Sequence, residues 1–131
     1  MIAVDTNVVV RLLVQDDPLQ SAKARRLFDA QAGEDGSLWL SDVVLVEVSW
    51  VLARAYDRSR VEVVTALRAL ASHATVQLES TAAVREAIAL YEHGPADFAD
   101  CLLVAQAQAL GCEQVATFDR KLRDLPGVKL L

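Results

Sequence analysis

Acidic residues stand at several points of this 131-residue chain where the surrounding sequence sets them apart. Asp5 directly follows a short apolar run at the N-terminus, and Asp119 follows a second apolar run in the same way. Glu47 lies inside a long apolar stretch, and Asp97 and Asp100 stand three positions apart at an expected helix start. Such a set of hard oxygen ligands suits Mg²⁺ or Mn²⁺. A divalent-metal site is therefore one hypothesis for these residues.

Most of these acids also have a purely structural explanation. Asp5 and Asp119 stand where an aspartate caps a following helix, and Asp97 with Asp100 fits a cap plus a favourable charge in the first turn. Glu47 differs, because an ionised carboxylate among apolar neighbours is destabilising unless it is paired or bound to a metal. We expect Glu47 to have little contact with solvent, and it is the strongest local indication of a metal site.

These acids can share a site only if the fold brings them to one edge of a sheet. The run Ile2–Val4 predicts a central strand of a parallel sheet, buried on both faces, with Asp5 at its carboxyl end. In open α/β sheets, ligands bind at that edge. Further short strands are predicted at residues 38–40, 75–78, 114–118 and 128–130. Helices are predicted at 8–14, 18–31, 42–56, from 60 onward, around 84–91, 97–110 and 119–125.

The alternation of helices and short apolar strands predicts the fold class, an α/β protein. We expect a three-layer α/β/α sandwich around a mostly parallel sheet of four to five strands. The helix 42–56 is apolar on all sides, so we expect it to be covered on all sides. Ser59 and Glu62 have the spacing of a capping box, and the helix beyond is predicted to bury Val61, Val64 and Leu67.

Composition narrows the class of protein. At 53% hydrophobic and 24% charged residues, the chain is expected to form one folded domain, residues 1–131. It contains no apolar run of membrane-spanning length and no signal-peptide pattern, so we expect a cytoplasmic protein without membrane contact. Cys101 and Cys112 are expected to be reduced. The net charge of −5 argues against a general nucleic-acid binder, but not against a nucleic-acid enzyme whose metals reverse the local charge.

Several other enzyme classes are disfavoured. The chain lacks the glycine-rich phosphate loops of nucleotide-binding proteins. His73 and His93 are expected to be surface or capping residues, and no Ser–His–Asp arrangement is suggested. A phosphatase with an aspartyl nucleophile usually has a second aspartate two residues after the first, and here that position is Asn7.

Four segments together resemble a known family. They cover the chain in order and at matching spacing: Val4-Asp5-Thr6-Asn7-Val8, Ser41 through Glu47 to Leu52, Asp97 through Asp100 to Leu103, and Val115 through Asp119 to Lys121. In these segments the chain resembles PIN-domain ribonucleases, and within them the VapC-type toxins of bacterial toxin–antitoxin modules.

The resemblance implies a site and a reaction. It implies a sheet ordered 3-2-1-4-5, with the catalytic and metal-binding acids Asp5, Glu47, Asp100 and Asp119 above its centre. Asp97, Thr6, Asn7 and Thr117 match accessory positions around that site. The implied activity is a Mg²⁺-dependent or Mn²⁺-dependent endoribonuclease that hydrolyses RNA phosphodiester bonds by metal-activated water.

The resemblance also implies partners. RNA is the substrate, a small antitoxin protein lies in a hydrophobic groove, and a second copy of the chain forms a homodimer. Five basic residues are candidates for guiding the RNA backbone: Arg11, Arg54, Arg120, Lys121 and Arg123. Two alternatives stay open, namely an RNA-processing PIN nuclease without an antitoxin and a PIN scaffold that binds proteins without cleaving RNA.

Overall fold

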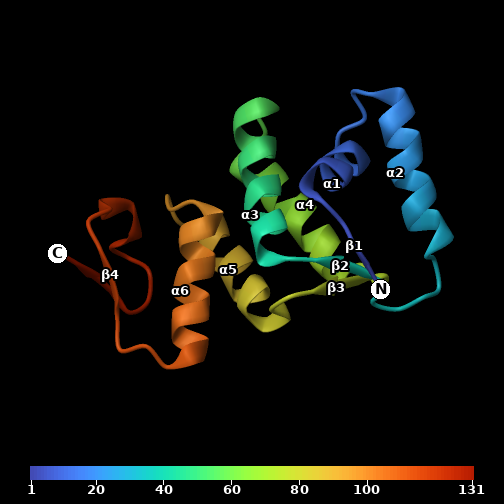
Figure 1. Ribbon diagram of the computed structural model, residues 1–131. Coiled ribbons are helices and arrows are strands. Elements are labelled where there is room, and N and C mark those ends of the chain that lie inside the picture. The colour runs from blue at the N-terminus through green and yellow to red at the C-terminus, as the bar shows by residue number, and fades with distance from the viewer. The chain divides into compact units, whose positions relative to one another are not determined.

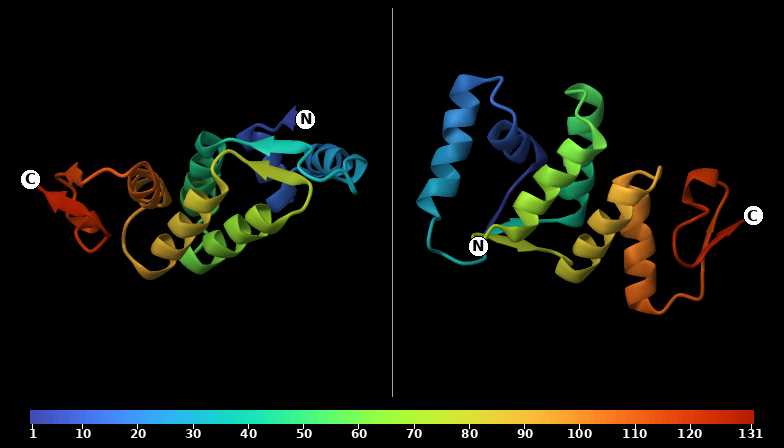
Figure 2. Two further views of the ribbon diagram at one scale, coloured as in Figure 1. Left: turned by 90° about the horizontal axis from the view of Figure 1, so that it is seen from below. Right: turned by 180° about the vertical axis from the view of Figure 1, so that it is seen from behind.

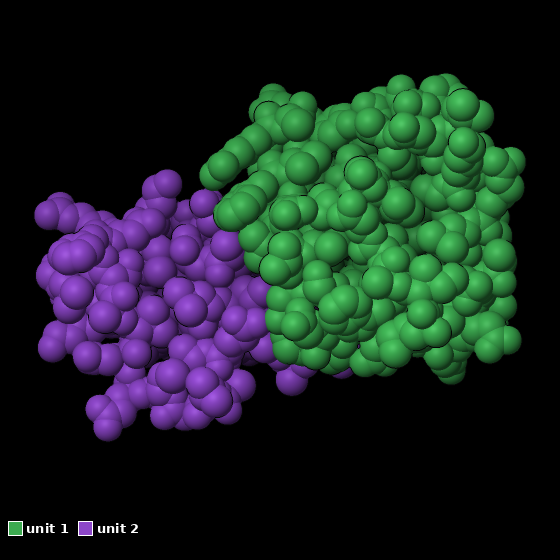
Figure 3. Space-filling view, in the orientation of Figure 1, with its two compact units in different colours: residues 1–81 green, residues 82–131 purple.

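The computed structural model describes residues 1–131, and the chain forms two compact units, residues 1–81 and 82–131 (Figure 3). Each unit combines helices with short parallel strands (Figure 1). The predicted α/β class is confirmed. That the two units act as one domain stays a prediction. No helix in the chain combines the length and apolarity needed to cross a membrane.

The first unit is built on a three-stranded parallel sheet. Its strands are β1 (Ile2–Ala3), β2 (Leu38–Leu40) and β3 (Val76–Leu78), paired in the order β1-β2-β3. Its helices are α1 (Thr6–Leu13), α2 (Pro18–Ala30), α3 (Asp42–Trp50), the π-helix η1 (Val51–Ala55) and α4 (Arg60–Ser72). Helix α1 packs beside α2 and α3, and α4 packs against α3 and β3 (Figures 1 and 2).

The second unit follows the same scheme on a smaller scale. Its helices are α5 (Thr81–His93), which begins at the boundary, α6 (Phe98–Leu110) and the 3₁₀-helix η2 (Arg120–Leu122). Strands β4 (Val115–Thr117) and β5 (Val128–Leu130) pair in parallel. Thus the 3-2-1 and 4-5 parts of the expected strand order are present, while the pairing of β1 with β4 and the layering stay predictions.

Local sequence explains where several elements begin and end. The Ser59 side chain accepts a hydrogen bond from the Glu62 backbone, and the Glu62 side chain accepts one from the Ser59 backbone, so the predicted capping box is present. Asp17 caps α2 ahead of Pro18, as expected. Gly111 ends α6 with a φ of 83°, a left-handed conformation that glycine adopts without strain.

Two expectations about the burial of apolar residues are wrong. Ile2 is 41% exposed, because β1 pairs with β2 on one side only within its unit. Val61 is 72% exposed, because it lies in the first turn of α4 on the outer face, and Val63 is buried in its place. Of the two cysteines, which are both free, Cys101 is buried and Cys112 is exposed.

Helix α3 also differs from the expected fully covered helix. Val44, Leu45 and Val48 form its buried face, but Val43 is 65% and Trp50 is 39% exposed. The expected helix to residue 56 also changes character after Trp50, where the backbone continues as the π-helix η1. A π-helical turn inside a helix is rare and is frequently found at functional sites.

The core of the first unit yields a stability prediction. Leu67 of α4 is 1% exposed, so Leu67→Ala should lower the free energy of unfolding by about 2–5 kcal/mol through lost burial and an unfilled cavity. The matched control is Val61→Ala on the same helix, which should change it by less than about 0.5 kcal/mol. Urea unfolding followed by circular dichroism measures both, and equal midpoints for the two variants would contradict this packing.

Candidate active site

Asp5 lies at the junction between β1 and α1. One of its carboxylate oxygens accepts a hydrogen bond from the Thr6 backbone N–H at 2.7 Å, and its carbonyl accepts the first backbone bonds of the helix, from Val8 and Val9. Asp5 is therefore a helix cap, the structural role that the sequence also allowed. Its side chain is exposed, and the second carboxylate oxygen takes no part in the cap.

Glu47 approaches the same junction from α3. The Thr6 hydroxyl donates a hydrogen bond to Glu47 Oε2 at 2.5 Å, across 41 positions of sequence. Thr6 is buried, so this bond gives its hydroxyl an acceptor and fixes the Glu47 side chain at the same time. The expectation that Glu47 is shielded from solvent is wrong, because this side of α3 is open and the carboxylate is exposed.

Together these residues line a pocket of about 300 Å³ within the first unit. Its polar wall contains Asp5, Thr6, Asn7 and Glu47. Val10, Arg11, Val51 and Tyr56 complete the lining. The pocket thus joins two exposed carboxylates, a buried hydroxyl that holds one of them, and a guanidinium group.

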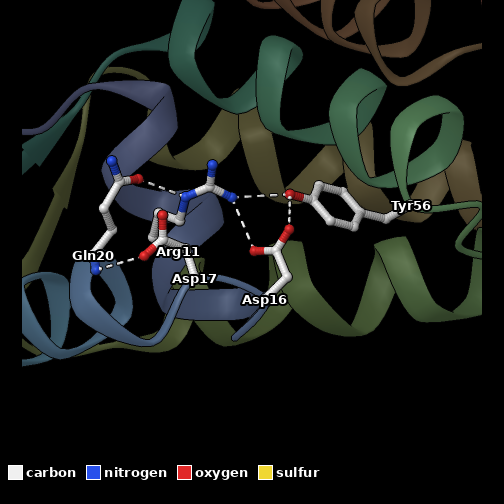
Figure 4. Close-up of polar contacts among 5 residues, drawn as sticks. All are labelled: Arg11, Asp16, Asp17, Gln20 and Tyr56. Atoms are coloured by element: carbon white, nitrogen blue, oxygen red, sulfur yellow. Dashed lines mark hydrogen bonds and ion pairs between the residues drawn. The ribbon is translucent and has the colours of Figure 1, made fainter.

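Arg11 is held in this wall by a network of polar contacts (Figure 4). Its Nη1 donates to the Tyr56 hydroxyl at 3.0 Å and to Asp16 Oδ1 at 2.9 Å, and its Nε donates to Gln20 Oε1 at 2.7 Å. The Tyr56 hydroxyl in turn donates to Asp16 Oδ2 at 2.8 Å. These bonds connect α1, the start of α2 and the end of η1 around one cation.

The network shifts the protonation equilibria of its charged members. The hydrogen bond with Tyr56 is the main cause that raises the pKa of Arg11, with further contributions from the negative charge of Asp16. The hydrogen bond from Tyr56 is also the main cause that lowers the pKa of Asp16, followed by the charge of Arg11. Both groups therefore stay ionised over the neutral pH range.

A second group of acids lies in the second unit. Asp97 stands at the N-cap position of α6, Asp100 follows in its first turn, and Asp119 comes directly after β4. The pKa of Asp100 is raised, first by partial burial and then by the negative charges of Asp97 and Asp119. The charges of Asp97 and Asp119 therefore both act on the Asp100 carboxylate.

Asp119 is fixed by its own turn. Its backbone N–H donates to the Thr117 hydroxyl at 3.0 Å, and its side chain accepts a hydrogen bond from the Lys121 backbone at 2.9 Å. The accessory residue Thr117 thus supports the backbone at Asp119. Asp119, like Asp5, is a cap, and its second carboxylate oxygen takes no part in that bond.

The predicted site residues consequently fall into two sets. Asp5, Thr6, Asn7 and Glu47 line the pocket of the first unit. Asp97, Asp100, Thr117 and Asp119 belong to the second unit. Within either unit, no three acidic, histidine or cysteine side chains are arranged to hold one metal ion together. The convergence of all four acids on one site stays a prediction.

Sequence reasoning missed Tyr56 of the pocket wall and Asp16, which bonds to both Tyr56 and Arg11. Tyr56 and Asp16 were not singled out, and Arg11 was only one of five basic candidates. The Asp16-Asp17-Pro18 sequence signals a helix start but not an ion pair with Arg11. Nothing in the sequence links position 11 to position 56, because that contact depends on how η1 ends beside α1.

Comparison with known proteins bears on this arrangement. The family model described as "PIN domain" matches residues 2–128. A curated protein named "VapC ribonuclease", from Aquifex aeolicus (strain VF5), is 23% identical over 121 residues, which cover 92% of this chain and 89% of that protein. No solved structure shows significant similarity to the chain. Since the family model spans nearly the whole chain, the protein belongs to the PIN domain family.

Proposed function

We propose that this protein is a metal-dependent endoribonuclease that hydrolyses RNA phosphodiester bonds with water as the nucleophile. The observation that carries the proposal is the pocket in which Asp5 and Glu47 stand together, with Thr6 bonded to Glu47. Membership of the PIN domain family and likeness to a protein named "VapC ribonuclease" support the same activity.

The residues present fit a divalent cation. The pocket offers carboxylate oxygens from Asp5 and Glu47 that are exposed and only partly used by the cap and by Thr6. Mg²⁺ and Mn²⁺ prefer such hard oxygen ligands. We propose Mg²⁺, with Mn²⁺ as a substitute, held by Asp5 and Glu47 together with Asp100 and Asp119.

When bound, such an ion polarises the scissile phosphate and lowers the pKa of a coordinated water. The protein's own residues prepare the site for this chemistry. The cap at Asp5 fixes one carboxylate against α1, and the Thr6 hydroxyl restrains the other through a single hydrogen bond. Because both carboxylates are held before substrate arrives, little reorganisation is needed on binding.

The pocket acids give the first test of the function. Asp5→Asn and Glu47→Gln should each lower RNA cleavage with Mg²⁺ by about 100-fold or more, because each removes a charged ligand. Asparagine caps helices as well as aspartate does, so Asp5→Asn should retain the fold. Cleavage of a labelled RNA, with and without EDTA, measures the effect.

The matched control for Glu47→Gln is Glu34→Gln, an exposed glutamate outside the pocket in the same unit, which should cleave like wild type. Calorimetric titration with Mn²⁺ adds a readout that is independent of turnover and should show weaker binding for the two pocket variants. Full cleavage by Asp5→Asn would refute the mechanism. A folded wild-type protein that binds Mn²⁺ but cleaves no RNA would favour a non-catalytic scaffold.

The acids of the second unit test whether residues outside the pocket also hold the metal. We expect Asp100→Asn and Asp119→Asn to lower cleavage and Mn²⁺ affinity as strongly as the changes at Asp5 and Glu47. Asp124→Asn is the control, because Asp124 is an exposed aspartate of the same unit. If both variants cleave like wild type, the metal is held by the pocket of the first unit alone.

We further propose that the protein is the toxin of a cytoplasmic toxin–antitoxin pair and forms a homodimer. The exposed Val43 and Trp50 on α3 support a partner on that face. Sedimentation should show a dimer that Val43→Glu converts to a monomer. The equivalent change at the exposed Val61 of α4 should leave the dimer intact, and a monomeric wild-type protein would contradict this part of the proposal.

A further inference from the structure

A second groove lies beside the pocket of the candidate active site. It has a volume of about 310 Å³ and runs between α1 and α2. Asn7 and Arg11 line both cavities, so the groove and the pocket meet at these two residues. The groove therefore adjoins the pocket that contains Asp5 and Glu47.

The groove is lined by both apolar and polar side chains. Val8, Ala24 and Leu27 contribute apolar surface, whereas Gln20 and Lys23 contribute an amide and a cation. Lys23 is exposed and has no carboxylate partner. Apolar walls with a few polar groups are typical of small-ligand sites, and this volume is at the lower end of their range.

Arg11 supplies the connection between groove and pocket. A guanidinium group has five N–H donors. The bonds to Gln20, Asp16 and Tyr56 use Nε and Nη1, and the third nitrogen, Nη2, makes none of the contacts drawn in Figure 4. The Nη2 donors are thus held in one orientation by the rest of the group.

Among the basic residues considered for RNA contact, Arg11 is distinguished by position. It lines the pocket that contains Asp5 and Glu47. The guanidinium of Arg54 instead lies over the Trp50 ring, 5.6 Å from its centroid. Lys23, which was not considered from sequence, is the second cation of the groove.

We propose that the groove between α1 and α2 binds the RNA nucleotide next to the scissile phosphate, with Arg11 and Lys23 contacting its flanking phosphates. The inference rests on the proposed nuclease function and names where its substrate binds. The apolar side chains would pack against a nucleobase, and the Asn7 and Gln20 amides would meet its polar edge. The positive charge of Lys23 complements a phosphate backbone at this place, and the oriented Nη2 donors of Arg11 offer it hydrogen bonds.

The test measures RNA binding without cleavage. A fluorescent single-stranded RNA decamer is titrated with the full-length protein in EDTA, and anisotropy gives Kd at several salt concentrations. Lys23→Ala should raise Kd by about three- to tenfold and reduce the slope of log Kd against log salt by about 0.7, the value for one lost contact to a single strand. Because Lys23 is exposed and unpaired, the change should not affect folding.

The matched control is Arg26→Ala, which removes an exposed cation from α2 outside the groove and should leave Kd and the salt slope near those of wild type. Arg11→Lys keeps the charge but cannot reproduce the three-way bonding, so it should weaken binding as well. If both Lys23→Ala and Arg11→Lys bind RNA with wild-type affinity, the proposal is overturned. That result is expected if the groove binds a peptide instead of RNA.

The same variants distinguish a failure of the groove proposal from a failure of the proposed nuclease function. Cleavage by wild type with Mg²⁺ tests the nuclease. If wild type cleaves while Lys23→Ala and Arg11→Lys bind and cleave like it, the groove proposal fails and the nuclease stands. If wild type binds RNA through Lys23 but does not cleave, the groove proposal stands and the nuclease fails.

Discussion

The hydrogen bond from Thr6 to Glu47 connects the start of α1 to the middle of α3. Thr6 is buried, and a buried hydroxyl without a partner would be unfavourable. Its acceptor is the exposed carboxylate of Glu47. One hydrogen bond therefore gives the buried hydroxyl a partner and fixes the orientation of the Glu47 side chain. The position of Asp5 depends on the same turn, because its cap bonds the backbone N–H of Thr6. The orientation of both pocket carboxylates thus depends on hydrogen bonds made by Thr6, one from its backbone N–H and one from its hydroxyl.

Much of the fold was accessible from the sequence because the signals are local. The Ser59–Glu62 capping box, the Asp17-Pro18 start and Gly111 at the end of α6 each act through neighbouring backbone groups. The family resemblance is likewise carried by short segments, and the PIN domain match confirms it. The exposure of Val61 was not accessible, since apolar periodicity does not show which turn of a helix reaches the core.

The site was predictable in part, and Glu47 shows why. Glu47 lines a pocket together with Asp5, but the expectation that it is shielded from solvent was wrong. The apolar neighbours suggested burial, whereas the helix has an open side and Glu47 is held by a threonine. Apolar sequence around an acid does not distinguish a buried helix from one with an exposed apolar face such as that formed by Val43 and Trp50. The Arg11–Tyr56 contact lies beyond any local pattern because it joins residues 45 positions apart.

The charge balance around Arg11 bears on the proposed binding of an anionic RNA beside an acidic pocket. Asp16 compensates the charge of Arg11, and Tyr56 bonds both, so the guanidinium adds little net positive potential. The network instead fixes the orientation of the Arg11 guanidinium group. Three hydrogen bonds hold Nε and Nη1, so the Nη2 donors point in one direction. Uncompensated Lys23 supplies long-range attraction instead. In the proposed complex, Arg11 would thus orient the phosphate and Lys23 would attract it, which would offset the repulsion from the neighbouring carboxylates.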